Sequence, residues 1–454
     1  MKIVLLNPPY FYKVVREGRC QHETAIWDSI YPPLSLATLA SFLRDRHDVI
    51  IIDAIAEGMD LAALLKALEA RKPDFVIASI STPTIHEDLR VLKQVRERSG
   101  ARIAIFGVHA TYFSQELIQE PYIDYVLLND PESAAVQIAS GVEEGLEGVV
   151  YRNKNGQVIR TPSGPGRAAS FRIPAWDLVD LSKYKIPIKG KKYVLVITAR
   201  SCPFNCSFCV VPYYSGRAVR YREIPEVIDE LKSVSAYVED VFFHTDLFTF
   251  KKDYVLKLCE AMIREKLNLH WICNSRVDTF DEEMAEAMKK AGCWMVSFGI
   301  ESGSQKVLDL CGKKITLAES RAAVAAARAK GLLTIGHFVL GFPGETEETL
   351  RQTLRFSREI NPDFVEFYIA TPFPGSRLFD QMKQDLRLDW KDIRYDYNPY
   401  HYPFDLAKIR KKAYLGFYLR PKKIWSFIRI FGIQKIVSMG VSGSRFLYSF
   451  LGKK

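Results

Sequence analysis

Three closely spaced cysteines constrain this chain more than any other feature of its sequence. Cys202, Cys206 and Cys209 follow the apolar run 193–198 at C-x3-C-x2-C spacing, so they lie on a loop leaving a predicted buried strand. The next cysteine, Cys259, falls far along the chain in a predicted helix. Structural zinc normally takes four protein ligands, whereas an iron-sulfur cluster held by three thiolates keeps one iron open for a small molecule. The spacing therefore favours a cluster over zinc and over unrelated buried thiols.

From about residue 191 to 385 the sequence alternates between short apolar runs and amphipathic stretches. This pattern is typical of repeated βα units, in which reactive groups lie on the loops after the strands. We expect strands at 194–199, 240–243, 270–274, 294–298, 333–340 and 364–369. We expect helices at 225–234, 253–265, 281–291, 317–330 and 346–360. Alternation alone also allows another kind of α/β sheet, so the strand ends decide between them.

The cysteine motif, with the aromatic Phe208 just before its last cysteine, resembles the signature of the radical S-adenosylmethionine (SAM) enzymes. Segments 299–304, 341–346 and 371–376, after the last three strands, match that family as well. The resemblance implies a partial (β/α)6 barrel of the TIM type over residues 191–385. It also implies a [4Fe-4S] cluster on the three cysteines, whose open iron binds SAM. The implied SAM contacts are Phe208, Asp246, Ser275, Arg276, Glu301, Ser302, Gly341 and Phe342.

Glu301 and Glu345 carry the carboxylates of two of these strand-end segments. Glu301 is a candidate to accept hydrogen bonds from the ammonium or hydroxyl groups of SAM. Two roles remain open for Glu345: it either approaches the adenine of SAM or caps the next helix. The other four cysteines of this region fall at irregular spacing, which is typical of buried inert thiols.

Residues 1–150 alternate strand and helix in the same way. We expect strands at 3–6, 49–53, 75–80 and 101–106, and helices at 34–44, 61–70 and 87–98. Such a pattern predicts a doubly wound, Rossmann-like parallel sheet, whose ligands bind at the carboxyl ends of the strands. No G-x-G-x-x-G follows the first strand, which disfavours a dinucleotide.

Four polar or small-residue loops, at 7–9, 79–84, 106–111 and 129–132, follow strands of this region. The arrangement resembles the cobalamin-binding domain that precedes the barrel in class B radical SAM enzymes. It departs from the family at 129–132, where Asn-Asp-Pro-Glu replaces Gly-Glu-Gly-Glu, and at Val108, where a second glycine is common. The residues implied around the corrin are Asn7, Pro8, Pro9, Ser81, Thr82, Gly107, His109, Thr111, Asp130 and Glu132.

The axial ligand of the cobalt is a separate question. The Asp-x-His-x-x-Gly motif is absent, and the Asp-x-His at 45–47 ends a predicted helix with no glycine after it. His86 and His109 are expected on strand-end loops, where a histidine is more often a hydrogen-bonding residue than a ligand. The resemblance implies a corrin held without histidine, which leaves cobalt open to accept a methyl group.

Residues 151–190 read as a connector and 386–454 as a mainly helical extension. The connector holds a predicted hairpin turn at 153–156, a breaker-rich linker at 161–166 and Trp176, which we expect to be a structural anchor between the two domains. In the extension, an aromatic stretch either covers the open barrel end and lines the substrate pocket or forms an ordinary packing cluster. Its members are Tyr395, Tyr397, Tyr400, Tyr402 and Phe404.

The positive charge of the chain is concentrated in that extension. Residues 408–454 contain 12 Lys or Arg and no Asp or Glu, so with +10 overall the preceding 407 residues sum to 10 − 12 = −2. A nucleic-acid partner is therefore not expected from the high net charge. Segment 422–431 mixes Trp, Phe and Ile with Lys and Arg, which suits an anionic membrane surface. The alternative is a helix packed on the barrel with a solvated basic face.

Several features predict a cytoplasmic protein, peripheral on the cytoplasmic membrane face if the extension binds lipid. The first nine residues are broken too early by proline for a secretory signal, and eight cysteines without such a signal indicate a reducing compartment. The sequence contains no uninterrupted apolar run of about 18 residues, so a simple transmembrane helix is not expected.

The resemblance implies a cobalamin-dependent methyltransferase. SAM is cleaved to a 5'-deoxyadenosyl radical, the radical removes hydrogen from an unactivated carbon, and methylcobalamin delivers a methyl group. An external electron donor such as flavodoxin or ferredoxin is implied as well, and the basic extension favours a hydrophobic, lipid-like or natural-product substrate. The alternatives are a cobalamin-dependent cyclase or ring-rearranging enzyme without net methylation, and a non-catalytic cobalamin or redox-sensing module.

Overall fold

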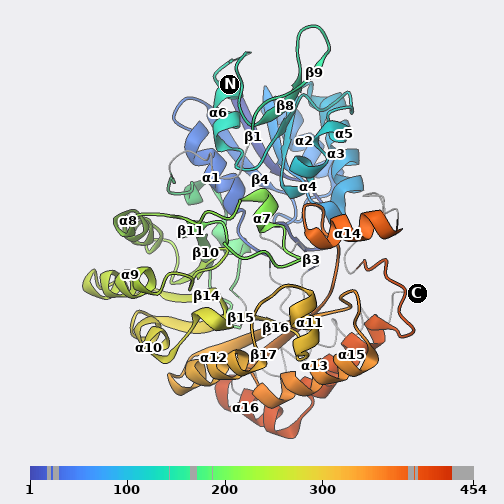
Figure 1. Cartoon of the computed structure of the whole chain (residues 1–454). Helices are drawn as coiled ribbons and strands as arrows, with labels where there is room; N and C mark the ends of the chain where they lie inside the picture. Colours follow the sequence, from blue (N-terminus) through green and yellow to red (C-terminus); the bar gives the residue numbers. More distant parts are fainter. Residues whose placement is uncertain are drawn as a thin grey trace.

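Two parallel sheets lie one above the other in the computed structural model, each with helices on its outside (Figure 1). The structure describes residues 1–17, 22–23, 30–142, 144–163, 171–186, 188–386, 393 and 397–431. Four sequence features lie wholly or partly outside these residues: Cys20, the linker from residue 164, Tyr395 and the extension beyond residue 431. Within the described residues, no helix is long and apolar enough to cross a membrane.

The upper sheet has the order β4-β1-β5-β6-β7-β8-β9. Its strands are β1 (Lys2–Asn7), β4 (Asp48–Asp53), β5 (Phe75–Ser79), β6 (Arg102–Phe106), β7 (Tyr125–Leu127), β8 (Val149–Arg152) and β9 (Val158–Arg160). The first five are parallel, in the register Val4 with Ile50 and Val76, and the last two form the predicted antiparallel hairpin. This parallel order, 2-1-3-4-5, is that of a doubly wound flavodoxin-like sheet, which confirms the predicted fold.

Helices cover both faces of this sheet because each strand is apolar on both sides. Helix α1 (Leu34–Leu43) and α6 (Glu132–Ala139) pack on one face, where Leu39 and Ile138 share a core. Helices α2 (Leu61–Arg71) and α3 (Ile85–Ser99) cover the other face. Short α4 (Val108–Tyr112) and α5 (Ser114–Leu117) follow β6. The expectation that His86 and His109 lie on loops was wrong. Each is the second residue of a helix, because α3 begins directly before His86 and α4 directly before His109.

The lower sheet is the partial barrel. Its order is β10-β13-β14-β15-β16-β17, and every neighbouring pair is parallel. The strands are β10 (Tyr193–Val196), β13 (Asp240–Phe243), β14 (His270–Arg276), β15 (Cys293–Glu301), β16 (Leu333–Leu340) and β17 (Phe364–Ile369). Six predicted strands are thus present. The first is shorter than expected, because the Thr198 N–H donates to the Thr245 hydroxyl at 2.8 Å instead of continuing the ladder. Residues Ala199–Arg200 instead form β11, paired antiparallel with β12 (Arg220–Tyr221).

The barrel helices pack on the outer face of this sheet around one large apolar core (Figure 1). They are α8 (Ile224–Val234), α9 (Lys252–Arg264), α10 (Glu282–Lys290), α12 (Leu317–Ala329) and α13 (Glu347–Ile360), close to the expected ranges. Helix α11 (Gln305–Leu310) follows β15, while α14 (Arg377–Leu386), α15 (Leu406–Tyr418) and α16 (Pro421–Phe431) follow β17. Buried Trp176 belongs to the same core, and the Ala175 N–H donates to Ala37 O of α1. The connector is therefore fixed to both sheets.

Candidate functional site

The cysteine loop lies at the carboxyl end of β10, between the two sheets. Cys202 and Cys206 are buried and Cys209 is half-buried, and Cys202 packs with Val211 and Leu247. The loop is fixed at Ser207, whose N–H donates to Cys311 O and whose carbonyl accepts from Leu378 N, both at 2.8 Å. Within the described residues, no three Cys, His or carboxylate side chains converge on a point where a single metal ion fits. A multi-iron cluster makes no such demand, because each thiolate binds a different iron.

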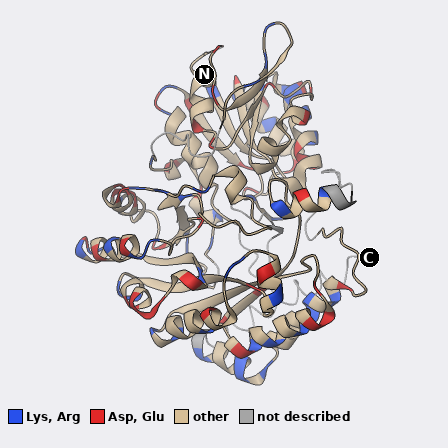
Figure 2. Cartoon of the chain, in the orientation of Figure 1, with Lys and Arg blue, Asp and Glu red and all other residues tan. Residues whose placement is uncertain are grey.

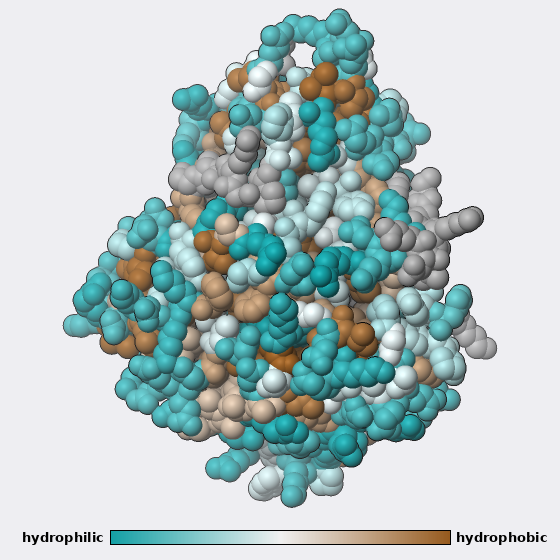
Figure 3. All heavy atoms as spheres, viewed as in Figure 1, coloured by the Kyte–Doolittle hydropathy of each residue, from teal (hydrophilic) through white to brown (hydrophobic). Residues whose placement is uncertain are grey.

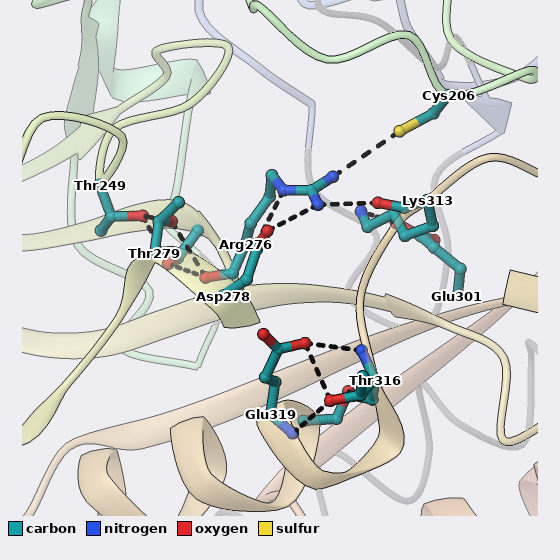
Figure 4. A network of polar contacts seen from close by, with 11 residues as sticks. Cys206, Thr249, Arg276, Asp278, Thr279, Glu301, Lys313, Thr316 and Glu319 are labelled. Atoms are coloured by element: carbon teal, nitrogen blue, oxygen red, sulfur yellow. Dashed lines mark hydrogen bonds and ion pairs between the residues drawn. The ribbon is translucent and has the colours of Figure 1, made fainter. Parts of the chain in front are cut away.

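Two cations lie beside the loop (Figure 4). The Arg276 guanidinium donates to the Cys206 sulfur at 3.7 Å and to Lys313 O at 2.8 Å, and it stacks 3.6 Å above the Phe204 ring. Bidentate contacts with Asp278 at 2.8 and 2.9 Å fix its orientation. Thiolates need compensating positive charge in a buried site. Arg276, which the sequence predicted near SAM, is thus placed against a predicted cluster ligand.

Buried Lys313 forms an ion pair with Glu301, with 2.7 Å between Nζ and Oε1 (Figure 4). Glu301 ends β15 in the left-handed region at φ 66°, where a non-glycine residue is strained. Ser201 and Asn129, at other strand ends of the cleft, also have positive φ, of 83° and 54°. Strained backbone that the surrounding structure maintains is characteristic of functional sites.

A cleft with an empty volume of about 1110 Å³, partly open to solvent, separates the strand ends of the two sheets. Ser79, Gly107, Asp130 and Glu132 line it from the upper sheet. The lower sheet contributes Ile197, Arg200, Tyr214, His244, Asp246 and Asn274. Gly107, Asp130, Glu132 and Asp246 are therefore brought to one cavity, as a site between two cofactors requires.

The carboxylates of Asp130 and Glu132 do not face open solvent. Arg200 contacts Asp130 at 3.0 Å and Glu132 at 2.5 Å, and Arg220 contacts Asp130 at 3.0 Å. The sequence reasoning missed both arginines, although Arg200 lies only two residues before Cys202. These ion pairs join the upper strand ends to the cysteine region across the cleft.

The remaining residues predicted around the corrin lie in or beside the upper strand ends. His109 is fully buried, its Nδ1 is 3.0 Å from the Thr82 hydroxyl, and burial lowers its pKa to about 3. The Ser81 hydroxyl is bonded to Thr84, and the Thr111 hydroxyl accepts from Asn129 N. Pro8 and Pro9 are buried at the end of β1. These side chains shape the loops, and their contact with a corrin stays a prediction.

Two observations show that the upper strand ends fit a large ligand with amide groups. Among the described residues, Asn7 Oδ1 and Glu132 Oε2 are buried acceptors without a hydrogen-bond partner. A Cβ on Gly107, whose φ is 128°, would lie 2.6 Å from Ile80 O, so only glycine fits there. The unpartnered acceptors suit a corrin ring with amide side chains, and Gly107 lets the loop after β6 pack closely on the end of β5 beside them.

The predicted SAM contacts on the lower sheet are less uniform. The Ser275 hydroxyl bonds Thr249, and the Phe208 ring lies 5.5 Å from that of Phe342. The Ser302 hydroxyl is fully buried against α13, 3.0 Å from the Thr353 hydroxyl. Ser302 therefore joins β15 to α13, and its predicted contact with SAM stays untested.

Glu345 does not cap the next helix, and its predicted approach to the adenine stays a prediction. Its Oε2 accepts from the backbone N–H groups of Gly341 and Phe342, and Thr346 caps α13 instead. Tyr402 donates from its hydroxyl to Gly341 O and Phe342 O, so part of the aromatic stretch packs on this same loop. Glu345 and Tyr402 thus hold the loop from both sides.

Burial raises the pKa of Glu345 from 4.5 to about 7. A raised folded-state pKa stabilises the fold fully below pH 4.5, and that contribution is lost as the pH rises through 7. In the unchanged protein, we expect the free energy of unfolding to fall by at most about 3 kcal/mol between those pH values. We expect Glu345→Gln to abolish this fall. Urea unfolding across this pH range measures it. Glu348→Gln, on the exposed face of α13, should leave the pH dependence unchanged, and equal effects of the two variants would contradict the assignment.

The sequence also missed a polar network on the inner face of the barrel. Ser297 Oγ is 2.5 Å from His337 Nε2, and His337 Nδ1 is 3.2 Å from the Tyr368 hydroxyl, which donates to Glu366. The four residues come from three adjacent strands, and only the folded register aligns them. They form one hydrogen-bonded network across β15, β16 and β17.

Two family models match the chain. The radical SAM superfamily covers residues 196–357 and the B12 binding domain covers residues 27–139. The chain is 33% identical over 442 residues to an uncharacterized methyltransferase of Pyrococcus horikoshii, covering 93% of each sequence. It is 28% identical over 395 residues to an anaerobic magnesium-protoporphyrin IX monomethyl ester cyclase of Rubrivivax gelatinosus, covering 83% of this chain and 70% of that one.

Two solved structures are similar in fold. One is a radical SAM methyltransferase of Kitasatospora setae with cobalamin and a [4Fe-4S] cluster bound, at TM-score 0.69, 18% identity and coverage of 85% of this chain and 78% of that one. The other is the cobalamin-dependent SAM radical enzyme OxsB, at TM-score 0.73, 14% identity and coverage of 97% and 71%. At such identities the likeness concerns the fold alone.

Proposed function

The chain belongs to the cobalamin-dependent radical SAM enzymes, whose cofactors are a [4Fe-4S] cluster, SAM and cobalamin, and we propose that it methylates an unactivated carbon of a small molecule. The observation that carries the proposal is the cleft between the strand ends of the two sheets. One wall of the cleft belongs to the matched B12-binding region and the other to the matched radical SAM region. A substrate in this cleft is therefore within reach of both cofactors.

When bound, the cluster with SAM supplies a 5'-deoxyadenosyl radical, and cobalamin supplies a transferable methyl group. Cys202, Cys206 and Cys209 hold the cluster in this proposal, and Arg276 balances the charge of the Cys206 thiolate. Glu301, paired with Lys313, faces the SAM side. Residues 1–150 form the cobalamin-binding domain, 151–190 the connector, 191–385 the radical SAM domain and 386–454 the extension. A small electron-transfer protein such as flavodoxin or ferredoxin reduces the cluster.

The substrate class follows from the walls of the cleft. The polar side chains of His244, Asp246 and Asn274 on the lower wall of the cleft support a substrate with at least one hydrogen-bonding group. The apolar side chains of Leu34, Phe106 and Ile197, which line the cleft, support a hydrophobic body. A molecule that combines both parts, such as a natural product, fits better than a pure hydrocarbon.

Methyl transfer and its alternatives are separated by isotope experiments. Anaerobic reaction of the reconstituted enzyme with SAM labelled in its methyl carbon should move the label into the product. A cyclase or ring-rearranging reaction, which the similarity to the Rubrivivax gelatinosus cyclase favours, would leave the product unlabelled. A chain that forms no 5'-deoxyadenosine at all would be a binding or sensing module instead.

Gly107→Ala tests the proposed corrin site. We expect the variant to lose most of its cobalamin on anaerobic gel filtration, because the new Cβ displaces the loop after β6 from Ile80 O. Gly100→Ala is the matched control, since Gly100 also has a positive φ, of 68°, but has nothing within 4 Å of a Cβ. Cobalamin content, read from its absorbance, measures the effect. Equal retention in the two variants would place the corrin elsewhere.

A further inference from the structure

Helix α16 packs one of its faces on the barrel. The Phe427 ring stacks on Phe364 at 5.3 Å and on Tyr418 at 5.9 Å. The buried ammonium of Lys423 donates to Pro362 O, and burial lowers its pKa to about 8. This face is therefore part of the fold, and it does not account for the other face.

Large apolar side chains of α16, together with Leu419 at the C-cap of α15, are exposed to solvent outside this packed face. Trp425 is 68% exposed, Leu419 is 63% exposed and Ile424 is 40% exposed. Lys422 and Arg429, also exposed, flank them. A group of exposed apolar side chains bordered by charged ones indicates an interaction surface, whereas a single exposed apolar side chain does not. We call these five residues the α16 face.

The charge around the α16 face has one sign. Residues 406–431 contain eight Lys or Arg and no Asp or Glu, and no acidic residue follows up to residue 454. In Figure 2 the ribbon of α15 and α16 carries Lys and Arg positions in blue. In Figure 3 the lower edge of the molecule is mostly hydrophilic. An anionic partner would therefore complement the charge of this face.

We propose that the α16 face docks on an anionic lipid membrane. Basic residues are attracted to the anionic headgroups, while tryptophan and aliphatic side chains enter the boundary between headgroups and acyl chains. A nucleic acid would neutralise the charge but offers no apolar layer for Trp425, Leu419 and Ile424.

The α16 face points away from the proposed active site. Phe364, which Phe427 covers, begins β17, whereas the cleft lies at the carboxyl ends of the barrel strands. Figure 1 shows α16 at the end of the molecule opposite the upper sheet. Docking would locate the enzyme at the membrane without bringing lipid to the cleft. The proposal is therefore independent of the substrate. Membrane binding at this face would not support the prediction of a lipid substrate.

Vesicle co-sedimentation of the full holoenzyme tests the proposal. Phosphatidylcholine vesicles containing phosphatidylglycerol should pellet the enzyme, and phosphatidylcholine alone should not. Lys422→Gln/Arg429→Gln should weaken binding by about 25-fold, since each basic residue near an anionic surface contributes roughly fivefold. Leu419→Ser/Trp425→Ser should weaken binding at least as much and should remove the quenching of tryptophan fluorescence by brominated lipids. Cobalamin content and 5'-deoxyadenosine formation should stay unchanged in both variants.

Two matched controls separate this face from general charge and apolarity. Lys66→Gln/Lys93→Gln removes two exposed charges from the upper domain, and Ile263→Ser removes a side chain that is 49% exposed on α9. Both controls should bind vesicles like the unchanged enzyme. The proposal is overturned if the enzyme stays in the supernatant, if neutral vesicles bind it equally well, or if the α16 variants bind as tightly as the controls. None of these outcomes bears on methyl transfer.

Discussion

Cys206→Ala should reduce 5'-deoxyadenosine formation by at least about a thousandfold while the chain stays folded. The substitution removes one of the three proposed thiolates, and two thiolates cannot hold a cluster that keeps one iron open for SAM. The Cys206 side chain is also the one that accepts from Arg276, so its loss removes the charge partner of that guanidinium. Iron content, the visible absorbance of the cluster and the low-temperature EPR signal after reduction should fall together with activity.

Cys259→Ala is the control for this experiment. Cys259 is a buried thiol on α9 that packs in the barrel core, outside the proposed cluster site. The control should keep its iron, its EPR signal and its 5'-deoxyadenosine formation. A Cys206→Ala protein that retained a full cluster and normal SAM cleavage would show that the cluster is held by other residues.

Lys313→Met should lower the free energy of unfolding by about 3 to 5 kcal/mol, the usual result of removing one partner from a buried ion pair. The methionine keeps all but the last atom of the side-chain length, but it leaves the Glu301 carboxylate buried without its cation. The same change should weaken SAM binding, because Glu301 is free to move from its strained position at the end of β15. Urea unfolding and equilibrium dialysis with SAM measure the two effects.

Two further variants make the Lys313 experiment specific. Lys314→Met changes the adjacent but exposed lysine and should cost less than about 1 kcal/mol. The double variant Lys313→Met/Glu301→Gln removes both charges and should recover much of the lost stability. If the double variant were less stable than Lys313→Met, the ion pair would not be the cause.

Local pattern in the sequence was enough for the cysteine loop and for most of the longer strands and helices, but it missed β7, α6, α11 and α14. Apolar runs such as 333–340 are long and bounded by turns, and β16 has those same limits. The cysteine spacing required no knowledge of the fold. Errors arose where tertiary contacts override pattern: Thr245 turns the chain at Thr198, and α4 starts so soon after β6 that its first turn reads as loop.

The missed residues share one property, that their partners are distant in sequence. Arg200 pairs with Asp130 and Glu132, about 70 positions away, and His337 meets Ser297 and Tyr368 through neighbouring strands. Periodicity reports which face a residue occupies, but not which residue faces it. The sequence pattern did not single out Lys313. Its role as the cation paired with Glu301 is evident only from its burial beside that residue.

The ion pairs between Arg200 or Arg220 and the upper carboxylates have a consequence for substrate selection. Opening the two domains would separate buried charges, which is costly, so these contacts fix the width of the cleft. A cleft of fixed width favours substrates that fit between its walls without separating them. We therefore expect the enzyme to discriminate among candidate substrates by their smallest dimension before it discriminates by polarity.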